Sequence, residues 1–293
     1  MVKVAIVRVD ERDILKGVKR IFELLGRPDL PVDAKIAIKL NLCYFKTFET
    51  GATSDPRVVE ALITYFKEEF PKADISLVEA DATSARQDLL FKWLGFQDLA
   101  RKHGVKCVNV SKEDGVEVEV KGKFLKKVRV PKTVLEADYL VNLAKMKTHL
   151  LTKITCALKN VYGLDPYPRK IEYHKSLDNA IVDLNTVFKP HLHFVDGLIA
   201  MEGEKGPLYG RPKKLGVFVA GSDPVAVDAT CARIMGFNPR YIGHIRKAAR
   251  RGLGTMDPEI VGESIENVKD KFEFRRLHAY AFRFAQFLRG IRR

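Results

Sequence analysis

The chain is poor in cysteine and has no long hydrophobic run. Its 293 residues include four cysteines, which lie far apart and form no C-x-x-C pair. That spacing excludes the common zinc and iron–sulfur motifs and favours reduced core thiols. No stretch approaches the roughly 18 consecutive apolar residues of a membrane span, and the start MVKVAIVRVD lacks the pattern of a signal peptide. We therefore expect a cytoplasmic protein without an iron–sulfur cluster of its own.

Acidic residues are fewer than basic ones. The chain has 37 Asp and Glu against 51 Lys and Arg, which gives a formal net charge of +14. Such a charge attracts nucleic acid, acidic membranes or anionic metabolites, and charge alone does not choose among them. Apolar residues make up 46% of the chain, which is enough to bury a core and argues against disorder.

Short apolar runs alternate with amphipathic stretches. Runs rich in β-branched residues predict strands at 2–8, 34–40, 74–80, 105–110, 138–143, 191–199 and 215–220. Helical spacing predicts helices at 12–26, 55–70, 87–103, 176–189 and 223–236. Asp55-Pro56 and Asp223-Pro224 are typical helix starts. The alternation predicts an α/β fold with a mainly parallel sheet and helices on both faces.

Two segments depart from this alternation. Residues 115–130 alternate with period two around Lys121-Gly122, which predicts an inserted antiparallel hairpin. Residues 275–293 hold six arginines and no acidic residue, with apolar side chains at helical spacing. We expect a single α/β domain over 1–272 and a basic amphipathic helix over 273–293. The helix would dock on the domain or on a second subunit of a homo-oligomer, and binding to nucleic acid or acidic lipid is the alternative.

Polar residues follow several of the predicted strands. Ligands of open parallel sheets bind beyond the carboxyl ends of the strands. Lys39 and Asn41 lie at one such end, and Glu79 and Asp81 at another. Because Lys39 is within an apolar run, it needs either a partner such as Glu79 or Asp81 or a path to solvent, and both alternatives stay open.

Residues 145–160, KMKTHLLTKITCALKN, concentrate basic side chains just after an apolar run. A solvated cationic helix is the simpler interpretation of a charge run. Threonines and an apolar side interleave with the lysines, so we favour a site for an anion. The predicted anion ligands from this segment are Lys145, Lys147, Lys159 and Asn160, joined by Lys39 and Asn41.

Histidines and aspartates supply further candidates. His149 and His174 lie 25 residues apart, a separation compatible with one shared site and an acid or base role. Asp196 and Asp223 each follow a predicted strand and would orient a lysine or bind a divalent metal ion. His191 and His193 share one strand face, which fits a metal pair or, more simply, a polar face.

The loop 200–212 contains Gly203, Gly206 and Gly210. Glycine lets the backbone approach a ligand closely and offers bare N–H groups. The spacing matches neither a P-loop nor the G-x-G-x-x-G pattern, so it carries no nucleotide prediction. We predict a flexible lid over the basic segment, with Gly206 and Gly210 against the bound anion.

Several motifs together resemble a known family. They are KLN and SDPRVVEAL near the start, then DYLVNLAKMKTH, ITCALKNVYG, FVDGLIAMEGEKGPLYG and VAGSDPVAVDATCARIMGF, in that order over about residues 36 to 255. The chain resembles the family of uncharacterised proteins known as domain of unknown function 362. Many of its members carry ferredoxin-like cysteine clusters, which this chain lacks. The resemblance therefore implies a role with a separate ferredoxin as one alternative.

A more distant similarity is to the catalytic domain of nickel-pincer lactate racemases. His149, Lys159 and His174 stand in a comparable order. The resemblance implies that Lys159 contacts a cofactor, that His174 approaches a metal and that His149 moves a proton. Ala157-Leu158 replaces the glycine pair before the racemase lysine. EADATSARQ has Ser84 and Arg86 where a histidine is expected, so we carry over the shape of the site and not the reaction.

These observations predict an enzyme acting on a small carboxylate or phosphate compound. Lys145, Lys147 and Lys159 would hold the anion and His149 would serve as acid or base. Racemase-like proton transfer is one reaction that fits, and the cofactor is left open. Nucleic-acid binding through the basic surface and electron transfer with a ferredoxin are the alternatives.

Overall fold

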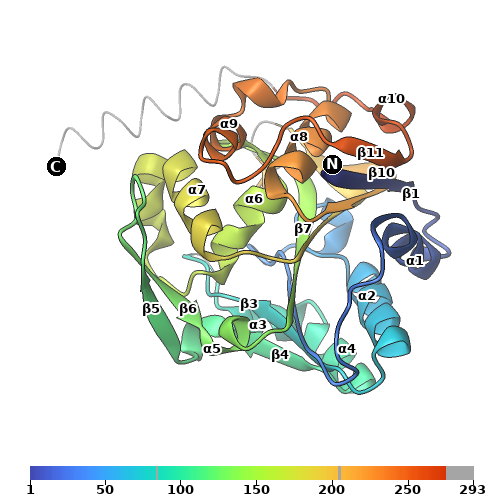
Figure 1. Cartoon of the computed structure of the whole chain (residues 1–293), viewed down its shortest axis with the longest axis vertical. Helices are drawn as coiled ribbons and strands as arrows, with labels where there is room; N and C mark the ends of the chain where they lie inside the picture. Colours follow the sequence, from blue (N-terminus) through green and yellow to red (C-terminus); the bar gives the residue numbers. More distant parts are fainter. Residues whose placement is uncertain (84, 204–205, 275–293) are drawn as a thin grey trace.

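A nine-stranded sheet forms the centre of the protein (Figure 1). The computed structural model describes residues 1–83, 85–203 and 206–274. In spatial order the sheet contains β11 (Glu259–Gly262), β1 (Lys3–Arg8), β10 (Arg211–Gly221), β9 (Leu192–Glu202), β7 (Tyr139–His149), β2 (Lys35–Lys39), β3 (Asp74–Glu79) and β4 (Lys106–Asn109), and β8 (Lys153–Thr155) pairs with β7. All neighbours from β9 to β4 are parallel, as are β1 and β11, so the predicted mainly parallel α/β sheet is confirmed.

Helices cover both faces of this sheet. They are α1 (Ile14–Leu25), α2 (Pro56–Glu69), α3 (Gln87–Trp93), α4 (Phe96–His103), α5 (Lys132–Leu135), α6 (Ala157–Asn160), α7 (Leu177–Val187), α8 (Pro224–Ile234), α9 (Gly243–Arg250) and α10 (Ile265–Val268). Ala5 and Val7 of β1 belong to the core shared with α1 and α2. Val4 and Ile6 belong to the core shared with α8 and α9. Alternate residues of one strand thus face opposite layers, as expected for a strand buried on both sides.

Two predicted helix starts are confirmed. Asp55 accepts a hydrogen bond from the backbone N–H of Arg57, and α2 begins at Pro56. Asp223 accepts from the N–H groups of Val225 and Ala226 at the start of α8. A side-chain acceptor followed by proline satisfies the first free N–H groups of a helix.

The prediction of one continuous helix over 87–103 is wrong. Two helices, α3 and α4, occupy this range and are separated at Leu94 and Gly95. Gly95 has φ of 80°, a left-handed conformation that interrupts the helix. Glycine reaches this conformation at little steric cost.

The predicted hairpin forms a separate two-stranded sheet of β5 (Gly115–Glu119) and β6 (Lys127–Pro131). The loop that connects the two strands is longer than the tight turn predicted at Lys121-Gly122. The buried carboxylate of Asp183 in α7 accepts the N–H groups of Lys123, Phe124 and Leu125. These bonds hold the loop of the hairpin against α7.

Strand β7 is longer than predicted. It runs over eleven residues, through the lysines that begin the basic segment. Lys145 and Lys147 are therefore strand residues with almost no exposure, not part of a solvated helix. The preceding apolar run did not indicate this extension, which depends on pairing with β9 and β8.

Other elements of the structure were not predicted, namely β8, β11, α5, α6, α9 and α10. The predicted helix at 273–293 falls almost entirely outside the described residues. Within the described ranges, no helix combines the length and apolar character that crossing a bilayer requires.

Candidate functional site

A cavity of about 300 Å³ lies beyond the carboxyl ends of β2 and β3, against the end of β7. Four lysines of the described residues line it, from four different segments: Lys39, Lys147, Lys159 and Lys170. Two histidines, His149 and His174, and the polar side chains of Asn41, Asn160, Cys43, Thr155 and Glu79 also line it. The site is therefore at the edge of the sheet where ligands of parallel sheets bind.

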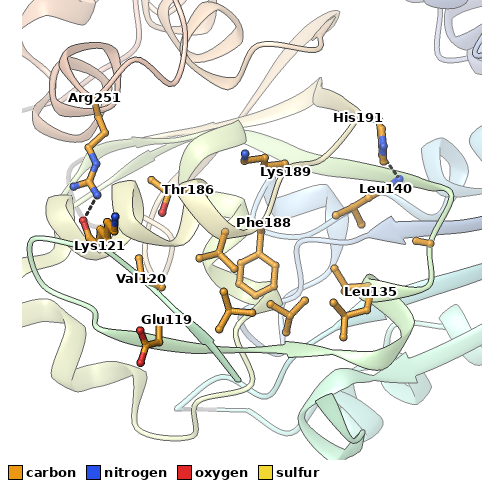
Figure 2. A pocket seen from close by; sticks show the side chains of 15 residues that line it. Glu119, Val120, Lys121, Leu135, Leu140, Thr186, Phe188, Lys189, His191 and Arg251 are labelled. Atoms are coloured by element: carbon orange, nitrogen blue, oxygen red, sulfur yellow. Dashed lines mark hydrogen bonds between the residues drawn. The ribbon is translucent and has the colours of Figure 1, made fainter. Parts of the chain in front are cut away.

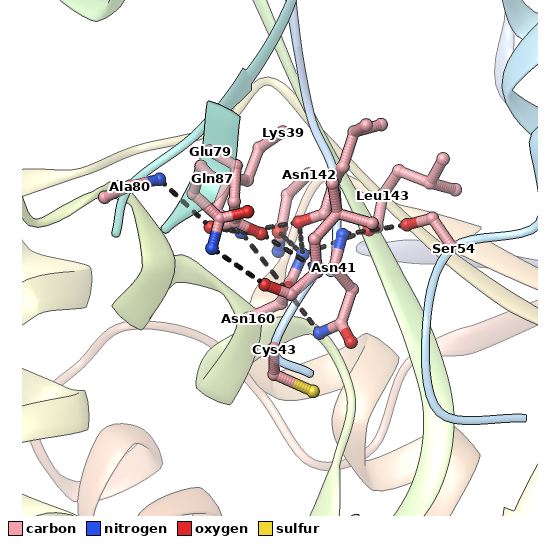
Figure 3. Close-up of polar contacts among 12 residues, drawn as sticks. Lys39, Asn41, Cys43, Ser54, Glu79, Ala80, Gln87, Asn142, Leu143 and Asn160 are labelled. Carbon is pink, nitrogen blue, oxygen red and sulfur yellow. Dashed lines mark hydrogen bonds and ion pairs between the residues drawn. The ribbon is translucent and has the colours of Figure 1, made fainter. Parts of the chain in front are cut away.

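Lys39 ends β2 and is 1% exposed. Its Nζ lies 2.9 Å from the carboxylate of Glu79, at the end of β3 (Figure 3). Glu79 also accepts the backbone N–H of Leu42 at 2.9 Å. Burial lowers the pKa of Lys39, and the charge of Glu79 opposes that effect. Of the two alternatives drawn from the sequence, the structure shows the ion pair with Glu79.

Three asparagines connect this ion pair to β7 and α6. Asn41 Nδ2 donates to Asn160 Oδ1 at 2.6 Å, and Asn160 Nδ2 donates to Asn142 Oδ1 at 2.8 Å. Asn142 Nδ2 donates in turn to the carbonyl of Ala157 at 2.9 Å. Figure 3 shows these side chains gathered around Asn160. Because all three are buried and bonded, they fix the wall of the cavity.

Lys147 lies in β7 and is 1% exposed. Its Nζ donates to Asn41 Oδ1 at 2.6 Å, to the Ala52 carbonyl, and to Cys43 Sγ at 3.4 Å. None of these acceptors is a carboxylate. Lys147 thus keeps a buried positive charge that is compensated by neutral oxygen atoms and one sulfur atom.

Lys159 reaches the cavity from α6. Its Nζ lies 3.7 Å from the centroid of the Tyr162 ring. The pKa of Lys159 is lowered to about 7, first by burial and then by the nearby charges of Lys147 and Lys170, with Cys43 opposing. A substantial share of this amine is therefore neutral near pH 7.

Lys170 stands at the start of a 3₁₀ segment (Lys170–Ser176) and is 4% exposed. Its Nζ donates to the carbonyl of Asp81 at 3.0 Å. Burial lowers the pKa of Lys170 to about 8. Across residues 1–83, 85–203 and 206–274, neither Lys147, Lys159 nor Lys170 forms an ion pair.

Both histidines of the cavity are neutral at neutral pH. His149 Nδ1 accepts the N–H groups of Leu151 and Thr152, so its ring carries the proton on Nε2. Burial, then the charges of Lys159 and Lys147, hold the pKa of His149 well below its usual value. Burial lowers the pKa of His174 to about 4, with Lys159 adding to the effect. His174 Nδ1 is buried and has no hydrogen-bond partner in the described part of the chain.

The structure places seven of the predicted site residues around this one cavity: Lys39, Asn41, Lys147, His149, Lys159, Asn160 and His174. The cavity also contains Thr155, one of the threonines that interleave with the lysines, and residues that the sequence did not single out, namely Cys43, Tyr162 and Lys170. No local pattern distinguishes these last three from ordinary core or loop residues. They belong to the site because the chain folds back over the sheet.

Lys145 has a different partner from the one predicted. Its Nζ lies 2.6 Å from Asp196 Oδ2, and neither side chain is more than 1% exposed. The two residues face each other across the parallel β7–β9 pair. Lys145 is therefore separated from the cavity and paired within the core.

The aspartates predicted to bind a metal ion have other contacts. Asp196 pairs with Lys145 and accepts the N–H of Leu198. Asp223 caps α8 and also accepts the N–H of Thr255. In the described ranges no group of three or more His, Cys, Asp or Glu side chains could hold a metal ion. Asp196 therefore orients a lysine, one of its two predicted roles, and metal binding at Asp196 and Asp223 stays a prediction.

The other sequence candidates also lie apart from the cavity. His191 Nδ1 accepts the N–H of Leu140, and His193 contacts Asn142, so this pair stabilises the sheet. Gly206 packs against the carbonyl of Thr148 and Gly210 against Met201, and of this loop only Pro207 lines the cavity among the described residues.

A second cavity, of about 610 Å³, lies beneath the hairpin (Figure 2). Val130, Leu140 and Phe188 form part of its lining, and Arg251 donates to the Lys121 carbonyl at its rim. It is larger than the first cavity, but it lacks a gathered set of buried polar side chains. We therefore assign the chemistry to the smaller cavity.

Comparisons with known proteins give three findings. The thylakoid-associated protein sll1697 of Synechocystis sp. is 29% identical over 140 residues, which are 45% of this chain and 43% of that protein, so the match spans less than half of the relative. The lactate racemase apoprotein of Thermoanaerobacterium thermosaccharolyticum has a TM-score of 0.47 at 11% identity, covering 80% of this chain and 57% of that one. The sequence model of the family described as Domain of unknown function (DUF362) matches residues 36–233. The chain therefore belongs to the DUF362 family.

Proposed function

We propose that this protein is an enzyme that binds a small carboxylate or phosphate compound in the cavity lined by Lys147, Lys159 and Lys170. The observation that supports the proposal most is the charge of the lining. Among the described residues its one carboxylate, Glu79, is engaged by Lys39. The other three lysines have no acidic partner in the described residues.

Buried ammonium groups are costly when no anion is near them. Lys147 and Lys170 donate to neutral oxygen acceptors, which compensate a full charge only in part. The carboxylates of Glu79, Asp165 and Asp81 raise the pKa of Lys170, but none of them forms an ion pair with it in the described residues, and burial lowers its pKa by more. A bound anion would add the missing negative charge, so part of the cost of building the site would be recovered on binding. The volume of about 300 Å³ suits a small molecule and not a polymer.

The two neutral histidines supply groups for proton transfer. His149 Nε2–H can donate a hydrogen bond to a bound molecule, and His174 Nδ1 is buried without a hydrogen-bond partner in the described chain. A neutral imidazole beside an anion site can take up a proton as a general base and return it as a general acid. This proposal retains the predicted acid or base role of His149, gives His174 a role in proton transfer in place of metal binding, and replaces the metal ion by lysine charge.

Thermal unfolding with oxalate or phosphate tests the anion site. A ligand that binds only the folded state stabilises it by about 2.7 kcal/mol at one hundred times its Kd. We expect either anion to raise the Tm of the parent protein and to have little effect on Lys159→Met. Lys16→Met removes an exposed lysine of α1 and serves as the charge-matched control.

Equal stabilisation of Lys159→Met and the parent protein would contradict the proposal. So would an equal loss in Lys159→Met and Lys16→Met, because that result would assign the effect to net charge and not to the cavity. Lys159 has no hydrogen-bond acceptor in the described chain, so its replacement leaves no buried group without a partner.

A further inference from the structure

Lys159 differs from the other lysines of the cavity in its contacts. Lys39, Lys147 and Lys170 each donate hydrogen bonds to oxygen atoms. Within the described residues Lys159 Nζ has no such acceptor, and its close contact is the face of the Tyr162 ring. An amine that is not tied to an acceptor is free to react with a bound molecule.

The ionisation of Lys159 agrees with that geometry. Its pKa of about 7 leaves about half of the amine neutral at pH 7. An exposed lysine has a pKa of about 10.4, so its neutral fraction at pH 7 is smaller by on the order of a thousandfold. The neutral amine has the lone pair that a nucleophile needs.

Groups around Lys159 suit a substrate with a carboxylate beside a carbonyl. Lys147 and Lys170 provide positive charge for the carboxylate. Thr155 is 4% exposed, lines the cavity, and its Oγ1 has no hydrogen-bond partner in the described chain. This buried hydroxyl is available to a carbonyl or hydroxyl oxygen of a ligand.

We propose that Lys159 forms an imine with the carbonyl carbon of a small 2-oxo carboxylate held in this cavity. The inference rests on the proposed function and adds the class of substrate to it. It gives Lys159 a covalent role, whereas the anion site by itself needs only its charge.

The step balances without any further reactant. The lone pair of the neutral Nζ attacks the carbonyl carbon, and a C–N bond forms as the C=O π bond breaks. One nitrogen proton passes to the oxygen by way of the neutral His174 ring, which gives a carbinolamine. The second nitrogen proton passes to the hydroxyl, to which His149 Nε2–H donates a hydrogen bond, and the C–O bond breaks. Water leaves and the C=N bond remains, so no oxidant or reductant is consumed.

Reductive trapping tests this inference on the full chain. The protein is incubated with pyruvate and sodium cyanoborohydride at pH 7, and the product is analysed by intact mass and peptide mapping. We expect one pyruvate-derived adduct, located on Lys159, and its rate should rise with pH through about 7 as the amine loses its proton. Methyl pyruvate, which lacks the carboxylate charge, should label Lys159 at least about tenfold more slowly.

Lys159→Arg is the matched variant, because it keeps the positive charge and removes the nucleophile. It should show no site-specific adduct, and the peptide map of the parent protein decides the outcome if this variant does not fold. Adducts spread over exposed lysines, with none enriched at Lys159, would overturn the inference.

The same samples separate this inference from the proposed function. Absence of a Lys159 adduct, with oxalate still stabilising the fold, would refute the imine and leave the anion site in place. Absence of both would refute the two together. Suppression of Lys159 labelling by oxalate would support both.

Discussion

Five lysines of the described chain are buried or line the cavity, and they differ in what compensates their charge. Lys39 and Lys145 face carboxylates, at 2.9 and 2.6 Å. Lys147 and Lys170 face neutral acceptors, and Lys159 faces an aromatic ring. The charges of Lys39 and Lys145 are neutralised within the protein, whereas Lys147, Lys159 and Lys170 leave positive charge available to a ligand. The partner of each lysine, and not its residue type, decides between core and site.

Cys43 offers a chemical probe of this charge. Its Sγ lies 3.4 Å from Lys147 Nζ and lines the cavity. A cationic cavity concentrates anions, so it should favour the anionic reagent iodoacetate over the neutral reagent iodoacetamide. We expect the ratio of their alkylation rates at Cys43 to be about tenfold or more higher in the folded protein than in the unfolded chain. Alkylation rates measured by peptide mapping check this expectation.

The other cysteines provide internal controls for that measurement. Burial raises the pKa of Cys107 to about 12, and Cys156 and Cys231 are fully buried. All three should react slowly with both reagents. An unchanged reagent preference at Cys43, or no protection of Cys43 by oxalate, would argue against a cationic cavity.

His193 predicts a specific dependence of stability on pH. Burial lowers its folded-state pKa to about 3, whereas an unfolded histidine has a pKa of about 6.5. The unfolded chain therefore binds one more proton between these values, so stability is retained above pH 6.5 and falls as the pH drops toward 3. The loss from this one residue is about 1.4 kcal/mol per pH unit.

Denaturant unfolding between pH 7 and 4 measures that effect. As the pH falls, the free energy of unfolding of His193→Gln should decrease less steeply than that of the parent protein. The difference in slope should correspond to about one bound proton. Its stability at pH 7 should also be lower, because the contact with Asn142 is altered. Identical slopes for the variant and the parent protein would show that His193 does not titrate in this way.

At the scale of elements, β7 is the strand that joins core and site. Lys145 and Lys147 both belong to it, two positions apart. The register of β9 shifts between them, so Lys145 lies opposite Asp196 and Lys147 opposite Met201. Lys147 therefore has no carboxylate opposite it in β9. Its acceptors come from the loop after β2, which supplies Asn41 Oδ1 and the Ala52 carbonyl.

Helix α6 is short, and its position depends on another element. Asp228 in α8 accepts the N–H groups of Ala157 and Leu158, at 2.6 and 3.3 Å. These bonds satisfy the start of α6, which carries Lys159 and Asn160 near its end. The buried contact between α6 and α8 therefore sets where Lys159 enters the cavity.

The hairpin of β5 and β6 depends on one side chain. Asp183 accepts three backbone N–H groups of the connecting loop and contacts Arg251. We expect Asp183→Ala to destabilise the fold by about 3 kcal/mol, because these donors lose their acceptor. Hydrogen exchange of residues 115–131 should become faster.

Asp98→Ala provides a matched control for that change. Asp98 is 74% exposed and pairs with Arg101 on the surface, so its replacement should cost about 1 kcal/mol or less. Equal effects of the two variants on exchange of the hairpin would refute the role assigned to Asp183.

At the scale of the whole molecule, the positive charge has two parts. Some of it is gathered around the cavity, and much of the rest lies on the surface, where lysines and arginines form ion pairs such as those of Lys19 and Arg27. Nucleic-acid binding, docking through 273–293, a ferredoxin partner and a cytoplasmic location stay predictions. Residues 275–293, on which the first two depend, lie outside the described chain.

Much of the fold could be predicted from local patterns. Each of the seven predicted strands corresponds to a strand of the structure, because apolar β-branched runs report burial directly. The helices of 12–26 and 55–70 correspond to α1 and α2, because helical spacing of apolar residues marks the face of a helix that packs on the core. The short elements β8, α6 and β11 were missed, because three or four residues are too few to show a period.

The sequence by itself determined the alternation of strands and helices, their caps, and the concentration of basic side chains after one apolar run. Spacing, capping and composition act over a few residues, so they can be read along the chain. Only the tertiary structure decided that Lys145 pairs with Asp196 and that Lys147 and Lys159 meet Lys170. Those outcomes depend on strand register and on segments more than a hundred residues apart, such as Asn41 and Asn160, whose contact no local pattern specifies.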